Sequence, residues 1–400
     1  LKTLTDGRPT GASGGELFYC LDHSTLDRKV RVGGRVWSRW GFRNSWDKRI
    51  LRIKRLLQKK FGNGLRVRVE LARSSKFTNT TMKAKLSKQL SPILLLSLTS
   101  LNADTFGTGA NEFDMDFVGI GDAGNAADTT GDPNPAGSVG YNYRMGVNEV
   151  SESMIGSYNA LIGTSGRPAI TLDSRGADKP ATSVSWNEAA RFVNWLNTSN
   201  GFSAAYKFTT GGANDNIALW QSGDAGFNAA NPFRNSNAQY FLPSEDEWYK
   251  AAYYDPAKNS GAGGYWDFPT GSDTAPTAVA GGTTSGTAIY DQAFATGPAD
   301  ITNAGGLSAY GTMGQGGNVW EWGESAFDQP NDSAGESRLF RGGNWSNSSS
   351  ILASSNRFNF GSPSSEVSVV GFRVSAVPEP SAFFLTLIST VCLVMRRKRL

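Results

Sequence analysis

The sequence predicts an α/β chain with two short helices, several short strands and long loops. At residues 185–188 and 244–247 a serine stands three residues before a glutamate, which is the capping box that opens a helix. Short runs after residue 112 alternate apolar and polar side chains, as strands with one buried face do. Stretches rich in glycine, asparagine, serine and threonine separate these runs and predict loops.

Each predicted helix begins at its capping box, where the serine hydroxyl and the glutamate carboxylate satisfy amides of the first turn. The first helix should span about 186–197, and the second should end before Pro256, which cannot continue a helix. The apolar residues at helical spacing are Ala189, Ala190, Val193 and Leu196 in the first segment and Trp248, Ala251 and Ala252 in the second.

The predicted strands are short and the predicted loops are long. Strands are expected at 113–117, in parts of 141–150, at 339–341 and at 369–374. The loops between them cover 119–140, 199–239 and 257–306. Loops of this length are uncommon unless they are functional or packed as compact Ω-loops.

Charge divides the chain into a basic part and an acidic part. Residues 1–81 carry 19 Lys/Arg against 6 Asp/Glu, whereas residues 104–376 carry 13 against 28. No nucleic-acid partner is expected for the acidic part, because phosphates favour a basic surface. The basic run within 1–81 is typical of translated non-coding or disordered sequence, with nucleic-acid binding as the alternative.

Residues 82–103 have the pattern of a secretory signal peptide. Met82 opens a lysine-rich start, an apolar run follows, and Ala103 supplies a small residue at the expected cleavage point. Signal peptides stand at the N-terminus of a protein. Residues 1–81 are therefore expected to come from a wrongly assigned start, or to form a basic extension.

Residues 377–400 end the chain with a motif, an apolar run and a basic tail, in that order. Pro378, Glu379 and Pro380 precede an apolar stretch at 382–395, and Arg396 and Arg397 begin the basic tail. The stretch is shorter than the ~20 residues of a usual span, and its basic tail fits a cytoplasmic stop. This order resembles the PEP-CTERM sorting signal of Gram-negative bacteria, which exosortase cleaves; an ordinary C-terminal anchor is the alternative.

The acidic region, 104–376, contains neither cysteine nor histidine. Cys20, Cys392 and His23 all lie outside it. It can therefore offer no thiolate nucleophile, imidazole base or His/Cys metal site, and oxygen ligands would favour calcium or magnesium. Paired-carboxylate chemistry of the glycosidase type stays open, although capping or solvated acids are the alternative. The acids in question are Glu245, Glu247, Glu321 and Glu324.

Several motifs of this region resemble the formylglycine-generating enzyme, or sulfatase-modifying factor, family. They are Gly-Gln-Gly-Gly-Asn-Val-Trp-Glu-Trp at 314–322, the Arg-Gly-Gly-Asn-Trp-Ser-Asn run ending at 347, and Gly-Phe-Arg-Val at 371–374, joined by the helix-entry segments at 180–186 and 241–248. The resemblance covers about 112–376. It implies one compact α/β domain of low regular secondary structure, the sulfatase-modifying-factor fold, related to C-type lectins.

The resembled family is a copper-dependent oxidoreductase that converts a sulfatase cysteine to formylglycine. It uses two cysteines of its own just after the Arg-Gly-Gly motif, and by spacing these positions hold Asn347 and Leu352 here. Copper is not expected, because Cu(I) selects soft sulfur ligands. The related ergothioneine-type iron enzymes need histidines and are excluded as well. The sequence therefore favours a protein that is not an enzyme.

The resemblance implies two further sites. A structural calcium would use the carbonyls of Gly317 and Val319 and the side chain of Glu321, although Gly314 replaces an acidic ligand of the family. The alternative is that Glu321 pairs with an arginine. A polar ligand-binding groove is expected from Arg341, Asn344, Trp345, Asn347, Ser348, Asn356 and Arg357; the alternative for Arg341 and Arg373 is a buried ion-pair role.

The leading hypothesis is an exported protein with a non-catalytic domain that binds a glycan or a protein. It would be secreted through the inner membrane, held briefly by a C-terminal membrane anchor, and placed in the envelope or extracellular matrix of a Gram-negative bacterium. Its partners would be exosortase and the secretion machinery during sorting, and then an extracellular polysaccharide or surface protein. The alternatives are a sulfatase-maturing oxidase and a passive matrix component.

Overall fold

A computed structural model of the chain describes residues 102–163, 168–357 and 360–378, together with four short segments nearer the N-terminus. The chain divides into two units, residues 1–96 and 97–400, which are described separately. In the first unit β1 (Phe18–Tyr19) pairs with β4 (Met82–Lys83), and β2 (Lys29–Val32) pairs with β3 (Arg35–Ser38), both antiparallel.

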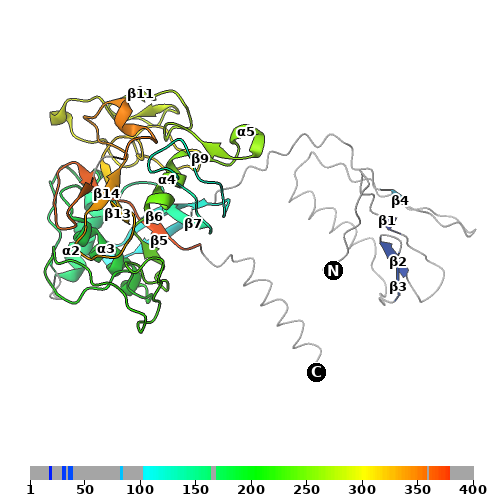
Figure 1. Cartoon of the computed structure of the whole chain (residues 1–400), viewed down its shortest axis with the longest axis horizontal. Helices are drawn as coiled ribbons and strands as arrows, with labels where there is room; N and C mark the ends of the chain where they lie inside the picture. The colour runs from blue at the N-terminus through cyan, green and yellow to red at the C-terminus, as the bar shows by residue number, and fades with distance from the viewer. Residues whose placement is uncertain are drawn as a thin grey trace, which may run out of the picture. The chain divides into compact units, whose positions relative to one another are not determined.

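The second unit is built on a five-stranded antiparallel sheet (Figure 1). Its order is β5 (Asn102–Phe106), β6 (Phe113–Ile120), β7 (Tyr143–Gly146), β17 (Ser375–Ala376) and β8 (Tyr240–Phe241). The alternation predicted after residue 112 is confirmed, since Met115 and Phe117 of β6 are buried. β5 begins at Asn102, so the cleavage point expected after Ala103 falls within this strand.

Both predicted helices are present. α3 (Trp186–Ser199) and α4 (Glu245–Tyr253) each begin with a complete capping box, as the serine–glutamate spacing predicted. α2 (Glu152–Ile162) was not predicted, although Ser151 caps it and Ile155, Tyr158 and Ile162 bury one face at helical spacing. That face was a readable signal in the sequence.

A second sheet has the order β15 (Phe360–Gly361), β14 (Arg338–Arg341), β13 (Trp320–Ala326) and β16 (Val370–Gly371). β13 is antiparallel to β14 and parallel to β16. The sequence did not predict β13, because nearly all of its residues are buried and a strand covered on both faces shows no alternation.

The main core lies where α3 and the two sheets meet. The ring of Phe192 in α3 packs 5.8 Å from that of Phe372, between centroids. Two buried tryptophans tie the layers together: Nε1 of Trp186 donates to the carbonyl of Gly323, and Nε1 of Trp322 donates to the carbonyl of Val184, both at 2.9 Å. Buried indoles normally need such a partner.

Short elements interrupt the long loops. They are η2 (Gly109–Asn111), β9 (Tyr254–Asp255), α5 (Lys258–Gly261), β10 (Gly264–Tyr265), β11 (Thr277–Ala278), β12 (Thr287–Ala288), η3 (Phe294–Thr296) and η4 (Ser349–Leu352). The predicted fold class, an α/β domain of low regular secondary structure, is confirmed.

In the part of the chain that the structure describes, no helix is long and apolar enough to cross a membrane. The apolar stretch expected to do so, 382–395, and the sorting signal from Glu379 onward lie outside the described residues. Most of the predicted signal peptide and of residues 1–81 lies outside them too.

Candidate functional site

The Arg-Gly-Gly motif brings the two family cysteine positions to one point. Gly342 and Gly343 both have positive φ, 99° and 83°, which favours glycine. A Cβ atom added at Gly343 would lie 3.2 Å from Cδ1 of Leu352 and 3.6 Å from Oδ1 of Asn347. An amide and an apolar side chain therefore face this glycine, at the two positions that the resemblance assigns to the family's cysteines.

The surroundings of these two residues are structural rather than reactive. Leu352 is fully buried against Ala288 and Tyr290. Oδ1 of Asn347 accepts a hydrogen bond from the amide of Asn344 at 2.8 Å, which closes a tight turn. Neither side chain supplies a nucleophile or a soft metal ligand.

Beside this turn lies a patch that we name the Asn347 surface: Asp291, Phe294 and Ser348, which are exposed, with Gln292 and Asn347, which are half-buried. The amide of Asp291 donates to the carbonyl of Asn347 at 2.8 Å, and Asp291 has a φ of 55°, a conformation that costs energy outside glycine. Phe294 is 58% exposed. The patch therefore presents one apolar ring at the surface next to a residue with positive φ.

Trp345 supports this surface from below. It is buried, its Nε1 donates to the carbonyl of Phe294 at 3.0 Å, and the two ring centroids are 5.5 Å apart. The guanidinium of Arg175 lies 4.9 Å from the indole centroid. Residues 291–294 were missed by sequence reasoning, because nothing in a glycine- and alanine-rich loop shows which stretch of chain it will meet.

The remaining candidates of the predicted groove engage a different partner. Arg341 is buried and Arg357 is half-buried, and both bind the carboxylate of Glu245, at 3.2 and 2.9 Å. Arg341 also donates to the carbonyls of Asp132 and Ser354. The buried ion-pair role proposed as the alternative for Arg341 is what the structure shows.

The side chain of Asn344 bonds to a near neighbour in the chain, whereas Oδ1 of Asn356 has no partner among the described residues. Asn344 is buried, and its Oδ1 accepts from the amide and the hydroxyl of Ser346. Oδ1 of Asn356 is buried and has no hydrogen-bond partner among the described residues. Ser348 is exposed, and its hydroxyl contacts that of Ser350 at 2.9 Å.

The expected calcium ligand Glu321 sits in a buried ion pair. Its Oε1 lies 2.5 Å from Nη2 of Arg373, and its Oε2 accepts from Nε of Arg373 and Nε1 of Trp248. Both of its oxygens are engaged by Arg373, which is the arginine pairing given above as the alternative for Glu321. The described residues contain no group of three or more His, Cys, Asp or Glu side chains arranged to hold a metal.

Glu149 lies next to this ion pair, and one of its buried carboxylate oxygens has no hydrogen-bond partner among the described residues. Its Oε1 accepts from Asn318, whereas its Oε2 has no hydrogen-bond partner among the described residues. A Cβ atom at Gly314 would lie 2.5 Å from Glu149 Oε1, so glycine is required there by the neighbouring acid. Calcium binding through Gly317 and Val319 stays a prediction, which a chelator-reversible rise in melting temperature would confirm.

Glu149 should make stability depend on pH. Burial and the nearby Glu321 raise the pKa of Glu149 from 4.5 to about 7. The folded state therefore binds this proton more tightly than the unfolded state does, and the free energy of unfolding falls as pH rises from about 4.5 to 7. We expect Glu149→Gln to be nearly neutral at pH 5 and stabilising by ~1–3 kcal/mol at pH 8.

The measurement is urea unfolding of both proteins with EDTA present, from pH 5 to pH 8. A difference between variant and wild type that stays constant over this range would contradict the role given to Glu149. Because every other group is shared, the comparison isolates this carboxyl.

Four acids were candidates for a glycosidase pair, and each is held by an arginine. Arg373 holds Glu321, Arg341 and Arg357 hold Glu245, and Arg234 bridges the remaining two. Burial disfavours the charge of Arg234, yet the two carboxylates hold its pKa well above the usual value. Each of the four carboxylates is thus already paired with a guanidinium. The two acids that Arg234 bridges are Glu247 and Glu324.

Fold and site together define a mixed α/β domain whose Arg-Gly-Gly turn presents two side chains to one point. Residues 140–377 match the family described as "Sulfatase-modifying factor enzyme 1-like domain". This match spans more than half of the chain, and the chain belongs to this family.

Two solved structures are similar to this chain. "Treponema denticola variable protein 1" is 22% identical, with a TM-score of 0.45, and the match covers 69% of this chain and 99% of that one. The structure entitled "Crystal Structure of CarF" is 19% identical, with a TM-score of 0.44, covering 66% and 99%. No match was found among curated proteins.

Proposed function

We propose that this chain is a non-catalytic member of its family that binds a glycan or protein ligand at the Asn347 surface. The observation that carries the proposal is the pair Asn347 and Leu352, which approach Gly343 where the resembled enzymes hold their thiols. The fold around the reactive point is retained and its reactive atoms are replaced. Binding is the function that we propose for this surface, with a passive matrix component as the alternative.

The exposed parts of the surface support binding. Phe294 offers an apolar face, Ser348 offers an exposed hydroxyl, and the half-buried Asn347 offers the nitrogen of its side-chain amide. Trp345 and Gly343 hold these parts in place from below. A rigid aromatic group with a few polar neighbours is the usual composition of a recognition site.

Export is part of the proposal. The signal at 82–103 and the sorting signal at 377–400 would take the domain through the inner membrane to the envelope or matrix, with exosortase as a partner. Fractionation of cells that express the full chain tests this step. Retention of the protein in the cytoplasm would contradict it.

The binding test uses the full-length protein on a panel of extracellular polysaccharides and envelope proteins. We expect Phe294→Ala to weaken binding about tenfold or more, because a central aromatic contact is lost. Leu307→Ala, which removes another exposed apolar side chain (47% exposed), is the matched control and should bind as wild type does.

Equal binding by the two variants would contradict the assignment of the surface. Conversion of a cysteine in a sulfatase-motif peptide by the wild-type chain, with copper, oxygen and a thiol reductant and above a control without the chain, would overturn the non-catalytic assignment and favour the oxidase alternative. Because Asn347 and Leu352 carry no thiol, we expect the peptide mass to stay unchanged.

A further inference from the structure

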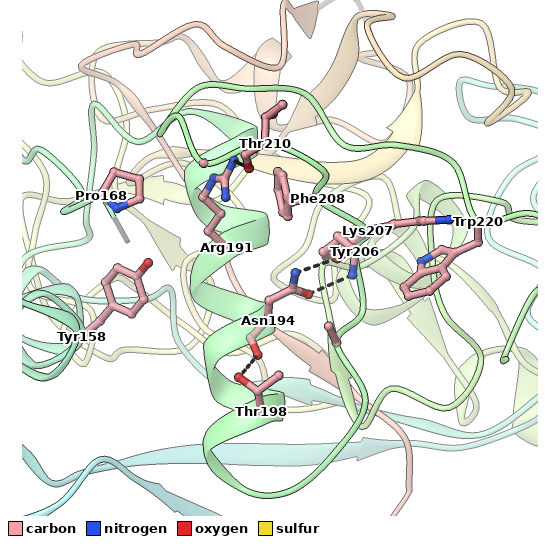
Figure 2. Close-up of a pocket in the computed structure, with 12 residues that line it drawn as sticks. Tyr158, Pro168, Arg191, Asn194, Thr198, Tyr206, Lys207, Phe208, Thr210 and Trp220 are labelled. Carbon is pink, nitrogen blue, oxygen red and sulfur yellow. Dashed lines mark hydrogen bonds between the residues drawn. The ribbon is translucent and has the colours of Figure 1, made fainter. Parts of the chain in front are cut away.

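A second candidate site is a pocket on the outer side of α3 (Figure 2). Its volume is about 440 Å³, within the usual range of about 300–1,000 Å³ for small-ligand pockets. Arg191, Asn194 and Thr198 line it from successive turns of α3, and the loop after residue 204 forms the opposite wall. None of the Asn347 surface residues lines it.

The wall of this pocket is held rigidly. The side chain of Asn194 donates to the carbonyl of Tyr206 at 2.7 Å and accepts from its amide at 2.8 Å. Nε1 of Trp220 donates to the carbonyl of Ala205 at 3.0 Å, and the amide of Ala218 donates to the carbonyl of Lys207 at 2.7 Å. These bonds preorganise the loop, which lowers the entropic cost of binding.

Two cation–aromatic pairs give the pocket its chemical character. The guanidinium of Arg191 lies 3.8 Å from the ring centroid of Phe208, and Nζ of Lys207 lies 5.7 Å from that of Trp220. Both rings are half-buried. Lys207 is oriented by Asp224 at 2.7 Å, a contact that occupies one of its three donors.

This combination selects a ligand class. Half-buried aromatic rings suit the apolar face of a sugar ring. The hydroxyls of Thr198 and Thr210 donate to the carbonyl of Asn194 and to Asp215, and their oxygens can still accept from the hydroxyls of a sugar. The two cations suit a carboxylate, because charge-assisted hydrogen bonds are the stronger ones. A long polyanion such as nucleic acid is disfavoured, because the surrounding region, 104–376, carries 28 acids against 13 bases.

We propose that this pocket is a binding site for a short acidic saccharide of the uronic-acid type. The sugar ring lies against the aromatic wall, and its carboxylate accepts hydrogen bonds from Lys207 and Arg191. The site is separate from the Asn347 surface and goes beyond the function proposed for that surface.

The test is calorimetric titration of the full-length protein with trigalacturonic acid and with neutral trigalactose. We expect the acidic trimer to bind more tightly than the neutral one, and Lys207→Gln to weaken its binding about tenfold, the loss typical of one charge-assisted hydrogen bond. Arg191→Gln should produce a loss in the same direction.

The chain offers a matched control in Lys258. Its Nζ also pairs with an aspartate, Asp273 at 2.9 Å, and also lies over a tryptophan ring, Trp266 at 3.8 Å, but it does not line the pocket. Lys258→Gln should bind trigalacturonic acid as wild type does.

Three results would overturn the proposal: no binding by the wild type, equal binding of the two trimers, or an equal effect of Lys207→Gln and Lys258→Gln. Phe294→Ala should leave binding of the trimer unchanged. This variant distinguishes the two proposals, because it changes the Asn347 surface and leaves the pocket residues intact.

Discussion

Arg373→Met is expected to lower the free energy of unfolding by ~3–5 kcal/mol, the cost of breaking a buried ion pair from one side. The guanidinium of Arg373 is fully buried. It binds both oxygens of Glu321 and donates to the carbonyls of Gly146, Val147 and Met313 at 2.7–3.1 Å. Methionine would leave a buried carboxylate and three carbonyls without this partner.

Urea unfolding of wild type and variant measures this loss. The double variant Glu321→Gln/Arg373→Met should recover part of it, because no uncompensated charge remains at Glu321. Lys179→Met is the control nearer the surface: Lys179 pairs with Asp300 at 3.0 Å, the two side chains are 31% and 45% exposed, and its change should stay below ~0.5 kcal/mol. A loss for Arg373→Met as small as that of the control would refute the role of this ion pair.

Arg234→Met is expected to have an effect of similar size, ~3–5 kcal/mol, because two buried carboxylates lose their common cation. Arg234 lies 2.6 Å from Glu324 of β13 and 2.9 Å from Glu247 of α4, and both acids are fully buried. Glu247 also caps α4. Loss of the arginine should therefore weaken the contact between this helix and the central strand of the second sheet.

Glu324→Gln is the variant to compare with Arg234→Met, because it changes one of the two acids that Arg234 binds. It leaves Arg234 paired with Glu247, so no buried charge stands alone, and it should cost less than Arg234→Met. Chemical denaturation at one pH compares the two variants. A larger loss for Glu324→Gln than for Arg234→Met would contradict the view that the arginine neutralises both acids.

Local signals in the sequence were enough for part of the fold. The capping boxes that begin α3 and α4 act within four residues, so they could be recognised before any tertiary contact was known. The alternation over residues 113–117 of β6 also reflects local geometry, because successive side chains of a strand point to opposite faces and only one of the two faces is buried there. In contrast, β13 is buried along nearly its whole length, and no periodicity distinguishes it from a buried loop.

The candidate sites, like the fold, were predictable where the signal was local and unpredictable where it depended on packing. The absence of cysteine and histidine from 104–376 excluded thiolate and imidazole chemistry from composition alone, and the motifs located the Arg-Gly-Gly turn. The motifs could not show that Arg373 binds both oxygens of Glu321, nor that the ring of Phe294 would pack on that of Trp345. Those contacts join residues about 50 positions apart, and only packing decides them.

The sequence by itself thus determined the family, the two capped helices and the loss of the family's thiols, because each depends on residue identity at known spacing. Only the tertiary structure decided which acids are neutralised by arginine, which ring is exposed and where a pocket forms. These properties depend on burial and on long-range contacts, which a linear pattern does not contain.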